Sequence, residues 1–526
     1  MNNFQTDETL LDEFTHKLLD DLFSETGKHF TADSHQKDEL NALVEKCRKE
    51  KRTVPIIDLF SRLYHFKKTS GQSPDTLGIT RQTLAELALS HSRIDEHGVT
   101  VGGRLTKALP IVEEAKMRVA EYLKKHPVEA PSGIELWDQI YENIQRIKKI
   151  LTISDEKWNS YSGQIGNCID SVEKFGKILD LPSHVLEDIL RVTQKYRMRL
   201  TPYYAALIQR SNFNDPVLIQ SVPTGEMADN VGIEIPPVAA DHSPARLIDQ
   251  FYPRVVTIKA TNMCAMYCTH CLRIAHIGKK DRIYSDQAYE EALDYIRTNP
   301  LIRDVLITGG DAFVLPDKML KKLLGALDEI DHVKMKRLGT RIPVTAPQRI
   351  ENELLDILEE SNDRKPVRVV TQINTAQEIT PVSREAFKQL SKRVTGVLNQ
   401  AVLLRGINDS RVKMWKLCET IHESYVRPYY VFNCSYRNPQ FSHLRVPVER
   451  GRDIIESMYG NISGDAIPRY IATAGGKIPL HRSNVIRHIG NTVILKKPWN
   501  NQQVEYPDAD AEAYAKTDFS FAKYKQ

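Results

Sequence analysis

Short β-forming runs alternate with amphipathic helical runs between residues 250 and 435, and this alternation limits the possible folds more than any other feature. The β-forming runs are RVVTIKAT (254–261), RDVLITGG (303–310), VKMKRLGT (333–340), VRVVTQIN (367–374), GVLNQAVLL (396–404) and VRPYYVFN (426–433). Helical stretches such as 286–299, 317–330, 351–362 and 383–394 lie between them. Six strand–helix repeats predict an α/β fold, a partial (β/α)6 barrel of the TIM-like type. In such barrels the chemistry lies on loops that follow the carboxyl ends of the strands.

The regions on either side of the predicted barrel have a different character. Residues 1 to about 212 carry apolar residues at helical spacing, and Pro127, Pro131 and Gly133 indicate a boundary near residue 130. The segment 460–500 is typical of further short strands. We therefore expect a helical N-terminal extension (1–130), a second helical region (131–245), the barrel (246–435) and a small C-terminal β-containing segment with a tail (436–526).

Composition excludes several classes of protein. The 526 residues carry 72 basic and 68 acidic side chains, a net charge of +4 that is too small to indicate nucleic-acid binding. No apolar run is long enough for a membrane span, and the acidic start MNNFQTDETLLDEF does not resemble a signal peptide. Seven cysteines in so long a chain do not indicate a disulfide framework. These features predict a cytoplasmic protein with no membrane or nucleic-acid partner.

Three of the seven cysteines fall together directly after the first predicted strand. TNMCAMYCTHCLR places Cys264, Cys268 and Cys271 at Cys-x3-Cys-x2-Cys spacing. Three thiolates can bind three irons of a [4Fe–4S] cluster and leave the fourth iron open for a substrate. The spacing by itself also allows a zinc site completed by His270 or a remote ligand, or three unrelated thiols.

Many further motifs resemble one known family. They are LTPYYAALI (200–208), DPVLIQSVPT (215–224), FYPRV, CTHCLR, DVLITGGDAF, TRIPV with APQRI, QINTAQEIT, NQAVLLRGIND, VRPYYVFNC, HLRVPV and AGGKIP. Over roughly residues 135–500 the chain resembles the radical S-adenosylmethionine superfamily and, within it, the lysine 2,3-aminomutase family. The resemblance implies an isomerase that moves the α-amino group of an amino acid to its β-carbon. The cluster would reduce S-adenosylmethionine, and the resulting 5′-deoxyadenosyl radical would take the β-hydrogen.

The resemblance also implies where the cofactors bind. Gly309, Gly310 and Asp311 match the loop that holds the methionine amino group of S-adenosylmethionine, and Gln372 is expected to contact the same molecule. Lys477 in TAGGKIPL matches the lysine that binds pyridoxal phosphate covalently. The tetrapeptide around Lys477 alone would favour a surface hairpin with a solvated lysine, and the flanking motifs reverse that preference.

Three more side chains are expected around pyridoxal phosphate and the substrate. Arg254 resembles the arginine that holds the cofactor phosphate, although its distance from Cys264 is one residue longer than in the family. Arg273 resembles the arginine that binds the substrate carboxylate. Gln400 fits either a polar contact to the cofactor or a hydrogen-bonded amide inside the barrel.

The substrate positions depart from those of the family members that use lysine. Those members have an aspartate after the last-strand cysteine and another before the glycine-rich lysine loop. This chain has Ser435 and Ala472–Thr473 there. Without these aspartates, the side-chain ammonium of a lysine substrate would be buried with no carboxylate beside it, which is costly. With Tyr436, Arg437 and Arg469 close in sequence, we expect an acidic or neutral polar amino acid as substrate.

Other expectations concern metals and partners. The chain has no cysteine after Cys434, and Ser410 occupies the barrel position of the family's zinc ligand, so we expect no zinc. The family implies an electron donor of the flavodoxin or ferredoxin type and a homo-oligomer. Residues 1–130 have no counterpart that we identify in the family.

The sequence leaves two alternative functions open. One is an enzyme of the same fold with another outcome, such as deamination or action on a modified or protein-bound amino acid. The other is a non-catalytic iron–sulfur or scaffold protein that kept the fold.

Overall fold

The computed structural model describes residues 11–24, 34–50, 53–91, 101–210, 212–223, 225–233, 243–277, 280–282 and 284–516. The chain forms two compact units, Met1–Glu121 and Tyr122–Gln526. Within the described ranges, no helix combines the length and the apolar character that crossing a membrane requires.

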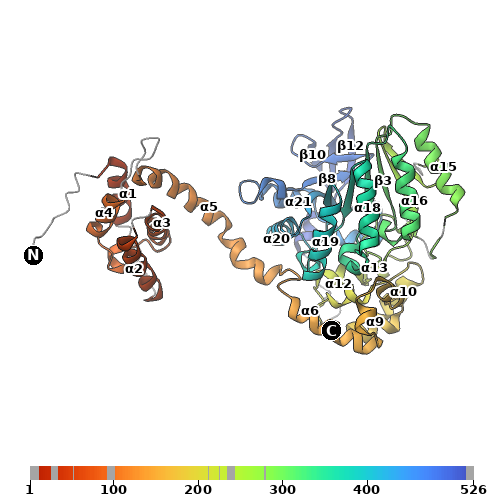
Figure 1. Ribbon diagram of the computed structural model, residues 1–526, viewed down its shortest axis with the longest axis horizontal. Coiled ribbons are helices and arrows are strands. Elements are labelled where there is room, and N and C mark those ends of the chain that lie inside the picture. The colour runs from red at the N-terminus through yellow and green to blue at the C-terminus, as the bar shows by residue number, and fades with distance from the viewer. Residues whose placement is uncertain are drawn as a thin grey trace, which may run out of the picture. The chain divides into compact units, whose positions relative to one another are not determined.

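The first unit is helical and has an apolar core of its own (Figure 1). Its helices are α1 (Glu13–Phe23), α2 (Ser34–Lys49), α3 (Thr53–Ser70), η2 (Pro74–Leu77), α4 (Arg81–Ser90) and the first part of α5 (Val101–Glu129). Asp12 caps α1, because its carboxylate accepts hydrogen bonds from the Phe14 and Thr15 amides at 3.1 and 3.0 Å. The boundary between the units falls inside α5, which ends at Glu129 just before Pro131.

A nine-stranded sheet, in the order β1 to β9, organises the second unit. The strands are β1 (Ile248–Tyr252), β2 (Val255–Thr261), β3 (Asp304–Gly309), β4 (Met335–Gly339), β5 (Val367–Thr371), β6 (Gly396–Leu403), β7 (Arg427–Asn433), β8 (Arg469–Thr473) and β9 (Lys477–Pro479). Strands β2 to β8 are parallel, whereas β1 and β9 pair antiparallel at the two edges. The predicted α/β fold and partial barrel are therefore confirmed, and the six predicted strands correspond to β2–β7.

Amphipathic helices cover the outer face of the curled sheet (Figure 1). They are α15 (Asp286–Arg297), α16 (Asp317–Asp328), α18 (Asn352–Arg364), α19 (Pro381–Arg393), α20 (Arg411–His422) and α21 (Val448–Glu456). Shorter helices in the connecting loops are α14 (Ile274–Ile277), η3 (Ala312–Val314), α17 (Ile342–Thr345), η4 (Pro347–Arg349), η5 (Ala376–Glu378), η6 (Pro439–Leu444) and η7 (Gly464–Ala466). Exposure alternates along the strands; in β2, Val256 and Ile258 are buried while Thr257 and Lys259 are partly exposed.

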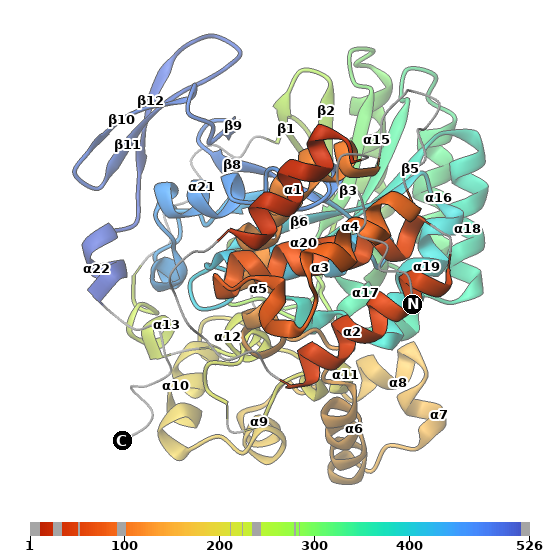
Figure 2. The same cartoon turned by 90° about the vertical axis from the view of Figure 1, so that its left-hand side faces the viewer.

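The helical arm, residues 130–233, lies at one end of the sheet in both views (Figures 1 and 2). Its helices are α6 (Trp137–Leu151), α7 (Asp155–Trp158), α8 (Tyr161–Gly166), α9 (Val172–Leu179), α10 (Ser183–Thr193), α11 (Pro202–Ala206), α12 (Pro216–Ser221) and α13 (Gly225–Asp229). The arm shares an apolar cluster with Leu404 and Cys434, which follow β6 and β7. It therefore closes over the carboxyl ends of the strands.

A small antiparallel sheet follows the barrel and lies beside β8 and β9 in Figure 2. It consists of β10 (Val485–Ile489), β11 (Thr492–Lys496) and β12 (Gln503–Pro507), and α22 (Ala511–Lys516) comes after it. The Tyr506 hydroxyl donates to Asn433 Oδ1 at 2.6 Å, so this sheet is tied to the end of β7.

Candidate active site

The cysteine loop leaves the carboxyl end of β2 and is fixed by hydrogen bonds from several elements. The Asn262 side chain donates to the carbonyls of Ile277 and Lys280 at 3.0 and 2.9 Å and closes the loop on itself. The Thr269 amide and hydroxyl donate to the carbonyls of Gln220 and Ile219 in the helical arm, at 3.0 and 2.9 Å. The arm and the barrel therefore position the cysteines together.

The three cysteines are free and partly exposed. Burial and the neighbouring anionic groups raise the pKa of Cys264 and raise that of Cys271 to about 12. Bound iron would offset this penalty, because coordination to a metal cation stabilises the thiolate and releases the thiol proton to solvent. Within the described ranges, no three His, Cys, Asp or Glu side chains surround the position of a single ion. A [4Fe–4S] cluster does not require three protein ligands around one ion, since each cysteine binds a different iron. The donor set therefore fits a [4Fe–4S] cluster.

The glycine loop after β3 lies against the cysteine loop. The Asp311 amide donates to the Met263 carbonyl at 2.8 Å, and a Cβ on Gly310 would approach that oxygen to 2.2 Å. The carboxylate of Asp311 accepts hydrogen bonds from Thr340 Oγ1 and the Arg341 amide, both at 2.6 Å. Asp311 thus joins the loops after β3 and β4. Its contact with the ammonium of S-adenosylmethionine stays a prediction.

Gln372 lies beside the cysteine loop. Its side-chain nitrogen is 3.3 Å from His270 Nε2, and the side-chain nitrogen of Asn374 is also 3.3 Å from that atom. Burial, with a further contribution from Arg341, lowers the pKa of His270 to about 3, so this imidazole is neutral. The role of Gln372 in binding S-adenosylmethionine stays a prediction.

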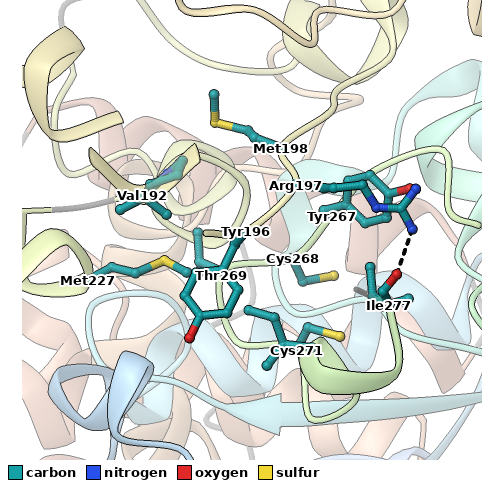
Figure 3. A pocket seen from close by; sticks show the side chains of 12 residues that line it. Val192, Tyr196, Arg197, Met198, Met227, Tyr267, Cys268, Thr269, Cys271 and Ile277 are labelled. Carbon is teal, nitrogen blue, oxygen red and sulfur yellow. Dashed lines mark hydrogen bonds between the residues drawn. The ribbon is translucent and has the colours of Figure 1, made fainter. Parts of the chain in front are cut away.

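A cavity of about 30 Å³ lies on the arm side of the cysteine loop (Figure 3). Cys268 and Cys271 line it together with Tyr196 and Met227. Figure 3 shows both sulfur atoms pointing away from Tyr196.

Lys477 begins β9, where it pairs with Thr473 of β8. Its amide donates to the Tyr252 hydroxyl at 2.9 Å. Its Nζ lies 4.8 Å from the ring centre of Tyr430 and 5.5 Å from that of Phe432, both on β7. Lys477 is therefore not a solvated hairpin lysine: its ammonium lies over the aromatic side chains of the sheet.

The surroundings of Lys477 lower the pKa of its amine and so increase the fraction of its neutral form. Burial is the largest cause that lowers its pKa to about 8, and Arg337 and Arg273 lower it further, while Asp304 raises it. Arg337 Nε and Asp304 Oδ1 form an ion pair at 2.8 Å between β4 and β3. A neutral amine is the nucleophilic form that an aldehyde cofactor requires. The residues present thus fit pyridoxal phosphate.

The other residues expected around Lys477 occupy different places. Arg273 Nη1 is 3.4 Å from Thr308 Oγ1 of β3, and its charge acts on Lys477. Gln400 pairs with Tyr430 across β6 and β7 and is partly exposed. Arg254 is exposed and precedes β2, at the amino end of that strand. The charge of Arg337 on β4 also acts on Lys477, whereas a role for Arg254 in binding the cofactor phosphate stays a prediction.

The predicted substrate residues lie after β7. Ser435 is partly buried, and its Oγ accepts a hydrogen bond from the Arg437 amide at 3.2 Å. The guanidinium of Arg437 is exposed, 5.9 Å from the ring centre of Tyr436. Arg469 is exposed at the amino end of β8, next to Tyr430. Roles for these side chains in binding the substrate stay predictions.

Comparisons with known proteins agree with this geometry. The family model described as the Radical SAM superfamily matches residues 258–417. Glutamate 2,3-aminomutase of Clostridioides difficile (strain 630) is 36% identical over 402 residues, which cover 76% of this chain and 94% of that protein. L-lysine 2,3-aminomutase of Clostridium subterminale is 36% identical over 357 residues (67% and 85%), and that of Bacillus subtilis (strain 168) is 34% identical over 397 residues (73% and 80%). The chain belongs to the radical SAM aminomutase family.

Membership has direct consequences for this aminomutase. It is an isomerase of the radical SAM type, and the family implies a [4Fe–4S] cluster and S-adenosylmethionine. Sequence reasoning missed Tyr252, Asp304 and Arg337 as neighbours of Lys477. No sequence signal singled out Arg337, because Lys336 beside it in β4 is also charged and the two point to opposite faces.

Proposed function

We propose that this enzyme is a pyridoxal phosphate-dependent amino-acid 2,3-aminomutase whose substrate is not lysine. The observation that carries the proposal is the position of Lys477. Its amine lies over Tyr430 and Phe432 with a pKa lowered to about 8. It belongs to the same barrel that holds the cysteine loop.

Each residue of this region has a physical task in the proposed reaction. Bound pyridoxal phosphate supplies a conjugated system that delocalises an unpaired electron next to the migrating nitrogen. Lys477 offers a neutral amine that holds the cofactor between turnovers. The guanidinium groups of Arg273 and Arg337 balance the charges of phosphate and carboxylate groups. Tyr430 and Phe432 keep water away from the reacting carbon.

The charge around Lys477 supports a substrate other than lysine. Asp304, the carboxylate that acts on Lys477, is already paired with Arg337. An ammonium side chain would therefore meet cations without a free carboxylate, whereas an acidic or neutral polar side chain would not. One relative of this chain is named for glutamate. Glutamate is accordingly the first substrate to test.

The test is anaerobic turnover of the reconstituted, reduced enzyme with S-adenosylmethionine, pyridoxal phosphate and a panel of amino acids. We expect 5′-deoxyadenosine and one β-amino acid by mass spectrometry. The Lys477→Ala variant should give no β-amino acid. Deoxyadenosine without a β-product from any amino acid in the panel would contradict the proposal and favour the alternative outcome, deamination or a modified or protein-bound substrate. The electron would come from a flavodoxin or ferredoxin type of donor.

A further inference from the structure

A buried arginine touches one of the cluster cysteines. Arg341 follows β4, and its Nη1 donates to Cys268 Sγ at 2.9 Å. Only 7% of the residue is exposed. A hydrogen bond from a guanidinium to sulfur in so dry a place is a strong electrostatic contact.

The other terminal nitrogen of the guanidinium, Nη2, is held by groups from two other parts of the unit. Nη2 donates to Glu378 Oε1 at 2.7 Å, to the Tyr204 hydroxyl at 3.1 Å and to the side-chain oxygen of Gln220. Tyr204 and Gln220 belong to the helical arm, and Glu378 ends η5 after β5. The arginine fork is therefore oriented toward Cys268.

Glu378 is held just as firmly and is completely buried. Its Oε2 accepts the amides of Asn374 and Thr375 at 2.8 and 3.2 Å, and the Tyr204 hydroxyl donates to Oε1 at 3.0 Å. These hydrogen bonds hold the carboxylate in place beside the arginine. The pair is thus a fixed dipole whose positive end faces a cluster ligand.

We propose that Arg341 raises the reduction potential of the [4Fe–4S] cluster through its hydrogen bond to Cys268, and that Glu378 limits this effect. Reduction adds a negative charge to the cluster. A nearby cation and a hydrogen bond to the ligand sulfur both stabilise the reduced state. The proposal rests on the cluster that family membership implies and is independent of the substrate.

The two partners of the ion pair should shift the potential in opposite directions. Arg341→Gln removes the cation and should move the midpoint potential to more negative values. Glu378→Gln leaves the arginine charge uncompensated and should move it to less negative values. Arg341→Lys keeps the positive charge but lacks the two terminal nitrogens of the guanidinium. Its midpoint potential should lie between those of Arg341→Gln and the unmodified enzyme. The measurement is a redox titration of reconstituted protein followed by electron paramagnetic resonance, without S-adenosylmethionine.

Arg349→Gln is the matched control. Arg349 is also buried, and its guanidinium donates to Asp317 and, at 3.0 Å, to the Phe313 carbonyl rather than to a cysteine. We expect an unchanged potential in this variant, whatever its stability. Equal potentials in Arg341→Gln and the unmodified enzyme would overturn the proposal, as would shifts of the same sign in Arg341→Gln and Glu378→Gln. If Arg341→Gln does not retain a cluster, Arg341→Lys and Glu378→Gln decide the question by the sign of their shifts.

Discussion

The cysteine loop and Lys477 differ in the balance of charged side chains around them. Beside the cysteines, Arg341 and Glu378 are both buried and neutralise each other. The Arg341–Glu378 pair therefore adds no net charge beside Cys268. Around Lys477, the charges of Arg273 and Arg337 lower the pKa of the amine, and among the described residues that act on it most strongly Asp304 is the carboxylate that raises it. These charges leave a positive balance in a partly exposed place.

This difference follows from what each region must hold. A cluster bound by thiolates stays in place during turnover. The charged side chains beside it can therefore keep the same hydrogen-bonded partners throughout. Phosphate and carboxylate groups arrive from water and leave again, and an uncompensated positive charge attracts them. The predictions below test whether the two regions can be disturbed separately.

The largest effect is expected from Cys268→Ser. Loss of one thiolate leaves two protein ligands for the cluster, so iron content and 5′-deoxyadenosine formation should fall to background. Iron and sulfide assays on anaerobically reconstituted protein measure the first, and mass spectrometry measures the second. Cys418→Ser is the control, because Cys418 is buried in α20 and should leave both unchanged. Full iron content in Cys268→Ser would contradict the assignment.

Lys477→Ala should abolish the covalent bond to pyridoxal phosphate and leave the cluster intact. The amine is removed, while the cysteine loop and its hydrogen bonds are untouched. Borohydride reduction followed by intact mass measurement should show a cofactor adduct in the unmodified enzyme and none in the variant. Both proteins should contain the same iron. An adduct of equal yield on the variant would assign the covalent bond to another lysine.

The charge balance around Lys477 predicts opposite pH shifts in two variants. The pKa of about 8 means that the neutral amine predominates above that pH, so covalent cofactor binding should increase as pH rises through 8. Arg337→Gln removes a cation that lowers this pKa, so its midpoint should move to higher pH. Asp304→Asn removes the opposing carboxylate, so its midpoint should move to lower pH. Visible absorbance of the bound cofactor measures both. Shifts of the same sign would show that only packing had changed.

Sequence patterns located the barrel because the strands alternate strictly with helices, and the six predicted runs are β2–β7. The edge strand β1 was missed, since it has only five residues and Pro253 follows it directly. The cysteine and glycine loops could be placed together because neighbouring parallel strands end at the same edge.

The pairings of charged side chains could not be predicted in the same way. Lys336 and Arg337 are consecutive in β4 and point to opposite faces. The structure buries Lys336 against α16 and α18, where its amine donates to the Ser361 carbonyl at 2.9 Å, and it pairs Arg337 with Asp304, from where its charge acts on Lys477. Which of the two faces inward depends on strand register. The contact between Arg341 and Cys268 likewise joins residues that are far apart in the chain.

The smallest effect should come from the glycines before Lys477. Gly476 has a φ of 132°, and a Cβ there would lie 2.6 Å from the ring of Trp499. Gly476→Ala should therefore cost about 1–3 kcal/mol of local strain and weaken pyridoxal phosphate binding. Gly475→Ala is the milder comparison, because its Cβ would meet only the flexible end of Lys497 at 3.4 Å, although its φ of 68° still disfavours alanine. Cofactor titration should rank the unmodified enzyme first, Gly475→Ala next and Gly476→Ala last, with equal iron in all three. Iron loss in Gly476→Ala would show that a change beside Lys477 also disturbs the cysteine loop. That result would contradict the view that the two regions can be disturbed separately.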